Sequence, residues 1–179
     1  MARVDRKRGR FNADQATDSI LHAMRGYAEN QGDWITYYRL DPDATVMDAV
    51  YDEAIGQGLL YRPPVRMQCL HVIHVEGGNE NSERGFYYND DLDAKIAFDL
   101  FLQAGMSVAD IATGNYLKDR VLYDRKLFRV TQLAVEGQIQ ERDIIIGLSA
   151  TQLKPDELVN DTQFAAWASG GPNDAEGTE

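Results

Sequence analysis

The first third of the chain has the hydrophobic pattern of an amphipathic helix. Asn12 and Gln15 have the spacing of a capping box at its start, and Gly32 is a typical stop. The pattern predicts a helix between residues 12 and 32. The apolar residues that share one helical face are Ile20, Leu21, Met24, Tyr27 and Ala28.

Two shorter segments follow this helix. Residues 34–40 are rich in aromatic and β-branched side chains, which predicts a short extended segment. The Asp-Pro-Asp sequence at 41–43 indicates a turn. Residues 44–55 place Val46 and Val50 on one side of a second predicted short helix, which ends at the glycines that follow.

From residue 65 onward the period changes from helical to alternating. Residues 65–76 predict one long strand entered through two prolines, which suit the beginning of a strand. Residues 91–103 predict the clearest strand, because Leu92, Phe98 and Leu102 all share one parity with the other apolar residues.

The last part of the folded region continues this pattern. Gly137 predicts a turn, and Gly147, inside a strand, predicts a bulge or bend. Residues 105–119 predict a long connection with one helical turn. Three further strands are predicted at residues 120–123, 127–136 and 139–153.

Strands at this spacing without helices between them predict an α+β fold, in which an N-terminal helical segment precedes a small antiparallel β-barrel or sandwich with flexible termini. The predicted segments are a basic disordered arm at 1–11, a helical segment at 12–60, the β-barrel at 61–155, a C-terminal arm or short helix at 156–168, and a disordered acidic tail at 169–179.

Charge is spread unevenly along the 179 residues. The 18 basic and 29 acidic side chains give a net charge of -11. The first ten residues hold five basic and one acidic side chain, so this arm carries +4 and the remaining 169 residues carry -15. An acidic body argues against a chain-wide nucleic-acid-binding surface. No apolar run is long enough for a transmembrane helix, and the basic start has no signal-peptide core, so we expect neither membrane insertion nor secretion.

The scarce reactive side chains form no catalytic or metal-binding pattern. His71 and His74 are three residues apart on a predicted strand, so they face opposite sides. Cys69 is the single cysteine, which excludes an intrachain disulfide and four-cysteine zinc sites and predicts a buried, inert thiol. Phosphate-binding loops and nucleophile elbows are missing. We therefore expect no enzyme activity, metal or cofactor.

Several short motifs occur in a fixed order between residues 34 and 167. They are V-Y-D-E-A ending at Ala54, Y-x-P-P-V from Tyr61, Asp119-Arg120-Val121, Phe128-Arg129-Val130, and an ending of Q-L-x-P-D-E-L from Gln152 followed by Asp161 and Phe164. This order resembles the head-to-tail stopper (head-completion) proteins that connect head and tail in long-tailed bacteriophages of actinobacteria.

The resemblance implies a structural virion protein of the phage neck, made in the host cytoplasm. It implies a ring of six or twelve copies, with an adaptor or portal ring above and the tail terminator or tail tube below. Packaged DNA would pass through without specific binding, and no cofactor, membrane or catalysis is implied. A tail terminator or another neck ring is the near alternative. A small cytoplasmic enzyme or a nucleic-acid-binding accessory protein is the alternative of another class.

Two loops and two groups of side chains are candidates within such a ring. The polar loop at 77–85 or the connection at 105–119 would project toward the lumen or the tail. Acidic side chains near the channel would repel DNA phosphates and let the DNA slide. The candidate lumen-facing acids are Asp90, Asp91 and Asp93, and the candidate interface residues are Ile111, Tyr116, Leu117, Phe164 and Trp167. For Phe164 and Trp167, packing on their own barrel is an equal alternative.

Overall fold

A computed structural model describes residues 13–48, 54–77, 79–82, 85–88, 90–139 and 142–168. The predicted arm at 1–11 and the tail at 169–179 lie outside the described residues. The helices are α1 (Ala13–Gln31), α2 (Phe98–Gln103), α3 (Val108–Thr113) and α4 (Ala165–Ala168), with 3₁₀ turns at Asn115–Lys118, Pro155–Leu158 and Thr162–Phe164. The strands are β1 (Asp33–Tyr38), β2 (Val65–Cys69), β3 (His71–Val75), β4 (Asn79–Ser82), β5 (Gly85–Tyr88), β6 (Asp91–Ala97), β7 (Arg120–Tyr123), β8 (Lys126–Ile139) and β9 (Arg142–Gln152).

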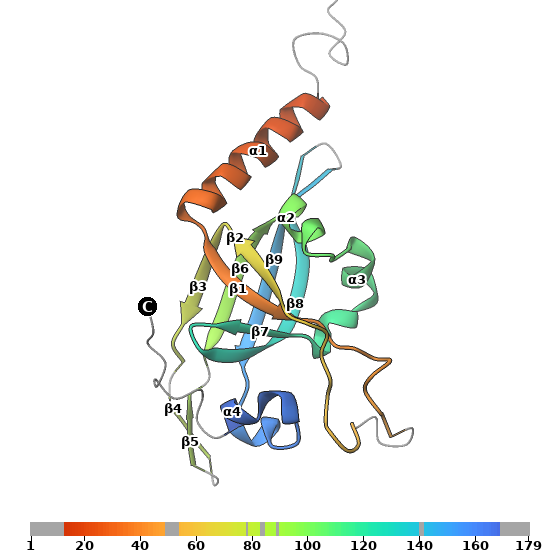
Figure 1. The fold of residues 1–179 in the computed structure, drawn as a ribbon. Helices are drawn as coiled ribbons and strands as arrows, with labels where there is room; N and C mark the ends of the chain where they lie inside the picture. The colour runs from red at the N-terminus through yellow and green to blue at the C-terminus, as the bar shows by residue number, and fades with distance from the viewer. Residues whose placement is uncertain are drawn as a thin grey trace, which may run out of the picture.

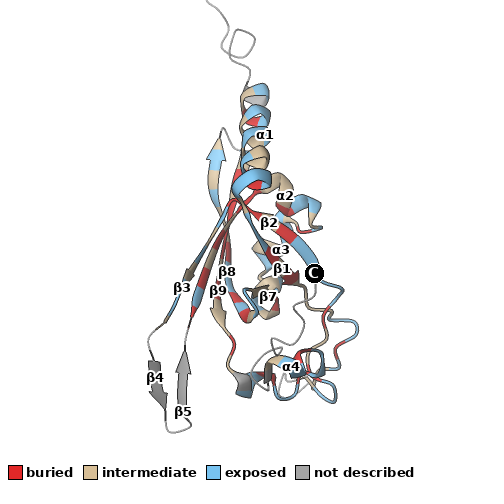
Figure 2. Ribbon diagram, turned by 60° about the vertical axis from the view of Figure 1, so that its left-hand side comes forward, coloured by how far each residue is buried: buried red, intermediate tan, exposed pale blue. Residues whose placement is uncertain are grey.

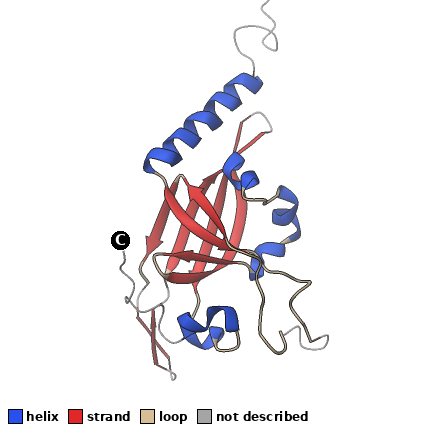
Figure 3. Ribbon diagram, in the orientation of Figure 1, coloured by secondary structure: helices blue, strands red, loops and turns tan. Residues whose placement is uncertain are grey.

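The centre of the molecule is an antiparallel seven-stranded sheet with the order β2-β1-β7-β8-β9-β6-β3. The β4–β5 hairpin forms a separate two-stranded sheet beyond the end of β3 (Figure 1). The helices and helical turns lie around the sheet (Figure 3). The described strand pairs are antiparallel, so no helix serves as a crossover between parallel strands. The α+β class and the N-terminal helix are confirmed.

The sheet is curled but not closed. The predicted long strand at 65–76 bends at Leu70, so that β2 pairs with β1 while β3 pairs with β6. At this bend the chain passes from β2, at one end of the sheet order, to β3, at the other end. The amide of Leu70 donates to Lys95 O of β6 at 2.7 Å. The expected barrel is therefore incomplete, because β2 and β3 lie at the two ends of the order and meet only at this corner.

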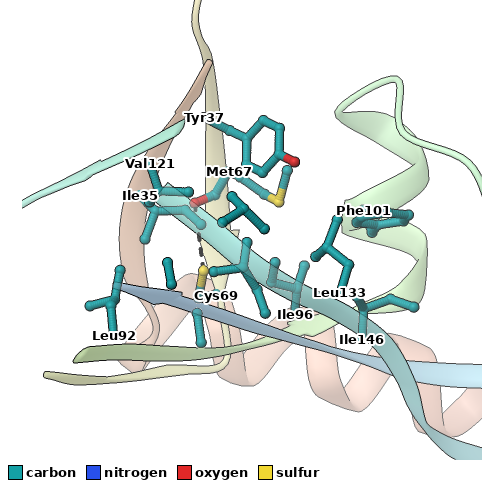
Figure 4. Close-up of a cluster of buried hydrophobic side chains, with 14 of the residues drawn as sticks. Ile35, Tyr37, Met67, Cys69, Leu92, Ile96, Phe101, Val121, Leu133 and Ile146 are labelled. Carbon is teal, nitrogen blue, oxygen red and sulfur yellow. Dashed lines mark hydrogen bonds between the residues drawn. The ribbon is translucent and has the colours of Figure 1, made fainter. Parts of the chain in front are cut away.

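One continuous core fills the concave side of the sheet. Alternate residues of β1, β2, β6, β8 and β9 point inward, and Phe101 from α2 covers them (Figure 4). Cys69 is part of this core and is fully buried. The largest core side chains are Ile35, Met67, Leu92, Ile96, Phe101, Phe128, Ile146 and Leu148.

The strand predicted at 91–103 is wrong in its second half, because it becomes α2 after Ala97. An extended strand would bury Leu102 and expose Phe101. Phe101 is instead 0% exposed and Leu102 is 46% exposed. The alternation of apolar residues persists through the segment, but good helix formers and the core contact of Phe101 determine its conformation.

The helix predicted at 44–55 is not found in the described part of that range; residues 49–53 lie outside it. The Thr45 hydroxyl donates to Asp41 O at 2.8 Å and accepts from the Leu60 amide at 3.1 Å. Ile55 N donates across to Val46 O at 2.8 Å. These hydrogen bonds between the two arms of the loop take the place of helical hydrogen bonds. Among the described residues, the helical part of the predicted segment 12–60 therefore ends at Gln31.

Gly137 does not form the turn predicted for it, and Gly147 does not form a bulge. β8 continues through Gly137 to Ile139, with register shifts on both sides of that glycine, so the predicted turn is wrong. At Gly147, β9 keeps its register with both β6 and β8 and has no bulge. The absence of a side chain at Gly147 leaves room for the Glu136 carboxylate, which lies across it to pair with Lys95.

The α1 helix leans away from the sheet, and its C-terminal half makes the contact (Figure 2). Ala28 packs with Leu70 and Ala97, and Arg25 pairs with Asp99 at 2.6 Å. The predicted stop at Gly32 is confirmed. A Cβ there would collide with Cys69 O, so glycine allows the close approach between helix and strand.

Candidate functional site: a motif cluster and an outer sheet face

Motif residues from three separate segments meet at one end of the sheet. The guanidinium of Arg120 lies between the rings of Tyr61 and Phe164, 5.0 Å from each centroid. It pairs with the carboxylate of Asp161, and both side chains are about 6% exposed. Asp161 also accepts a hydrogen bond from Leu59 N at 2.9 Å. These contacts join the 40–61 loop, the start of β7 and the C-terminal turns.

Asp119, next to Arg120, ties the same end of the sheet to β1. Its buried carboxylate accepts from the Tyr37 hydroxyl and the Leu40 amide, each at 2.8 Å. Burial raises the pKa of Asp119 to about 6, against the lowering effect of these hydrogen bonds. Burial and the neighbouring carboxylate also raise the pKa of Tyr37 far above its ordinary value. Sequence reasoning missed this role, although an acid directly before a strand is a visible signal.

A pocket of about 480 Å³ opens beside this cluster. Arg120 and Arg129 belong to its lining together with Leu117 and Glu157. Arg129 and Glu157 form an exposed ion pair at 3.3 Å. The Nη1 atom of Arg120 is buried without a hydrogen-bond acceptor. Four large exposed apolar side chains lie on the segments that form the pocket, namely Val46, Ile55, Leu117 and Val159.

The five candidate interface residues have different environments. Phe164 is 1% exposed and packs with Tyr61 of the same chain. This matches the alternative stated above, in which Phe164 packs on its own barrel. Trp167 lies 5.7 Å from the Phe164 ring and donates to Arg125 O at 3.0 Å. Ile111 and Tyr116 pack against the main core. Leu117 alone among the five is more than half exposed, at 52%.

The convex side of β6, β9 and β8, here called the outer face, is polar. Asp91 is exposed and accepts from the Thr151 hydroxyl at 3.1 Å. Asp93 accepts from the Ser149 hydroxyl at 2.6 Å. The cations of this face are paired with acids, Lys95 with Glu136 and Arg129 with Glu157. The face therefore presents carboxylates and hydroxyls, and its two cations are neutralised.

Asp90, the third candidate lumen-facing acid, does not share the outer face. Its side chain is about 2% exposed and pairs with Lys126 Nζ at 2.6 Å. It also accepts from Gly77 N at 3.0 Å and contacts His74 Nε2 at 2.9 Å. Although burial opposes ionisation, these hydrogen bonds lower the pKa of Asp90 below its ordinary value. Asp90 holds the start of the β4–β5 hairpin to the sheet.

The remaining reactive side chains lie as predicted. His71 is exposed and His74 is partly buried, so the two face opposite sides. Burial raises the pKa of the Cys69 thiol to about 12, which keeps it protonated and unreactive at neutral pH. No cluster of potential metal ligands occurs among the described residues. Within the same residues, no helix combines the length and apolar character needed to span a membrane.

Comparison with known proteins gives little. No protein-family model matches the chain, and no curated protein matches its sequence. A solved chain from the virion of a native gene transfer agent particle aligns with 68% of this chain and 94% of its own length. The identity is 10% and the TM-score 0.41, too low to establish a shared fold or role.

Proposed function

We propose that this chain is a structural protein of a phage virion, of the head-to-tail stopper type, that forms a ring in the neck between the portal or adaptor and the tail. One observation carries the proposal. Tyr61, Arg120, Asp161 and Phe164 come from three of the motifs that resemble stopper proteins, and they form a single buried cluster. Motifs that matched by chance would have no reason to converge in space.

The outer face fits the wall of a DNA channel in such a ring. Asp91 and Asp93 lie on it and would face the packaged DNA. Lys95 and Arg129 are each paired with a carboxylate, which offsets their attraction for phosphates. Repulsion between these carboxylates and the DNA backbone would let the genome slide past. The role is structural and uses no catalysis or cofactor.

A tail terminator is the second candidate, because it would also form a ring and the open sheet departs from the barrel that the stopper resemblance implied. A stopper was expected to contain a small β-barrel, whereas this sheet is open and flanked by helices. Both candidates form rings that DNA traverses. They differ in position, because a stopper contacts the adaptor and a terminator contacts the tail tube.

Immunogold labelling of virus particles with an antibody against this chain tests the virion role. We expect gold at the junction of head and tail. Labelling of lysate protein without labelling of particles would contradict the proposal and favour a cytoplasmic factor. A map of the particle neck then separates the two candidates, since it shows whether this ring contacts the adaptor or the tail tube.

A further inference from the structure

We propose that the exposed edge of β3 in one copy docks on the Arg120 pocket of the next copy, so that copies join head to tail in a flat ring. This inference rests on the proposed ring function and names the interface that would build it. The partner is a second copy of this chain.

The β3 side presents two apolar side chains and a carboxylate. Ile73 and Val75 are 49% and 50% exposed, and they lie on the convex side of an edge strand that pairs only with β6. Glu76 follows directly, is exposed, and forms no ion pair with any described residue. Sheet edges with exposed apolar residues are normally protected, because they pair readily with other chains. This edge therefore needs a cover.

The pocket side has complementary chemistry. Leu117 and Val159 are 52% and 70% exposed beside an opening whose wall includes Arg120 and Arg129. Arg120 has a buried Nη1 without an acceptor, although its Nη2 pairs with Asp161. Because that atom is buried, a carboxylate from outside would instead meet the guanidinium of Arg129, whose side chain is 52% exposed, and apolar side chains beside it would cover the rim. Val75 and Glu76 provide this combination.

The two sides lie on opposite flanks of the molecule. β6, β9 and β8 separate β3 from β7 in the sheet order. Figures 1 and 2 both show β3 on one side and the 40–61 loop on the other. Contact between two different patches is heterologous and repeats from copy to copy, so it generates either a ring or an open helical filament.

The strand register favours the ring. Val75 is opposite Asp91, Asp91 opposite Thr151, Thr151 opposite Arg129, and Arg129 opposite Arg120. The two docking patches therefore lie in one row across the sheet, at the same height along the strands. A ring closes when successive copies are related by rotation without translation along the rotation axis, and two patches in one row are compatible with that condition. The outer face between them would line the lumen.

Mixed cysteine crosslinking tests this arrangement. Val75→Cys and Leu117→Cys are purified separately, mixed at high concentration and treated with a short bifunctional thiol reagent. We expect crosslinked dimers in the mixture and at least about fivefold less in either variant alone, because only unlike patches meet. The buried Cys69 stays unreactive, so the wild-type chain is the blank.

A matched pair of exposed positions away from the row controls for random collision. Tyr27→Cys and Leu102→Cys replace side chains of similar exposure, and we expect only background crosslinking from their mixture. Crosslinks in Val75→Cys alone would indicate symmetric edge-to-edge pairing and would overturn the proposal. Equal yields from the matched pair, or no crosslink in the Val75→Cys and Leu117→Cys mixture, would also overturn it.

Charge reversal tests the polar part of the contact. In the cysteine background, Glu76→Arg or Arg129→Glu alone should lower the crosslink yield about threefold, and the two together should restore it. If the double variant does not recover the crosslink yield, the contact is apolar without an ion pair, and the role of Glu76 is overturned. Crosslinking without neck labelling would leave this interface standing and remove the neck function. Neck labelling without this crosslink would support the neck function and overturn this interface.

Discussion

At the scale of single residues, Asp119 and Arg120 hold the lower end of the molecule together. Asp119 holds β1 through Tyr37 and Leu40, and Arg120 holds the 40–61 loop and the C-terminal turns through Tyr61, Asp161 and Phe164. The two adjacent residues thus anchor segments that are far apart in the chain. The sequence motif around them could be recognised from the residues alone, but their partners could not, because the contacts span 41 to 82 residues.

Replacement of Arg120 by methionine should cost about 3–5 kcal/mol of unfolding free energy, because it leaves the Asp161 carboxylate buried without its cation. Arg129→Gln is the matched control. It breaks an exposed pair with Glu157 and should cost less than about 1 kcal/mol. Urea unfolding followed by circular dichroism measures both. Similar losses in the two variants would show that Arg120 is not an anchor.

Asp119 should make stability depend on pH. Its pKa in the folded protein is about 6, above the ordinary value of 3.8, so the folded state binds the proton more tightly than the unfolded chain. Its contribution to stability should therefore fall as the pH rises from about 4 to about 6, and stay constant above. A difference of two pKa units corresponds to about 3 kcal/mol at most.

Asp119→Asn should remove this dependence, because asparagine keeps an acceptor for the Leu40 amide and does not ionise. The measurement is urea unfolding of the variant and the wild type across this pH range. The wild type should lose stability relative to the variant as the pH rises. Parallel profiles would contradict the raised pKa of Asp119.

At the scale of elements, periodicity predicted what local sequence determines and failed where tertiary contacts decide. The α1 helix, the extended segment at β1 and the alternation of β6 follow from one face of apolar side chains. The bend at Leu70 depends on which strand pairs with each half of the predicted 65–76 strand, and no local signal records it. The 44–55 segment fails as a helix because Thr45 bonds to distant backbone.

The two readings of residues 98–103 give opposite predictions for single alanine variants. Because α2 buries Phe101 and exposes Leu102, Phe101→Ala should lose about 3–5 kcal/mol of stability. Leu102→Ala should lose less than about 0.5 kcal/mol, as expected for a surface substitution. Thermal or urea unfolding compares them. A larger loss of stability in Leu102→Ala than in Phe101→Ala would contradict α2 and support the strand that the sequence predicted for this segment.

At the scale of the whole molecule, the curled sheet separates three surfaces. The β3 edge lies at one flank, the Arg120 pocket at the other, and the polar outer face of β6, β9 and β8 spans the sheet between them. The acidic balance of the sequence predicted that some carboxylates would face DNA without gripping it. Asp91 and Asp93 lie on this face. Asp90 is instead buried and forms an ion pair with Lys126.

The outer face makes a prediction for assembled particles. Particles that carry Asp91→Lys and Asp93→Lys should deliver DNA poorly, because each copy in the ring would add two cations beside the passing phosphates. Counterion release at each new contact would hold the DNA more tightly as salt falls. Plaques per physical particle should drop at least about tenfold, and the defect should be smaller at higher salt.

The matched control changes the same net charge away from this face, with Glu29→Lys and Asp43→Lys, two exposed acids on α1 and the 40–61 loop. Plaques per particle should stay within about twofold of the wild type, since these positions lie off the channel wall. Equal losses in both double variants would mean that total charge, and not the outer face, governs DNA passage. Normal delivery by Asp91→Lys and Asp93→Lys particles would place this face away from the DNA. The two acids accept hydrogen bonds from the Ser149 and Thr151 hydroxyls on the outer face and are not part of the hydrophobic core, and circular dichroism of the purified double variant checks that it stays folded.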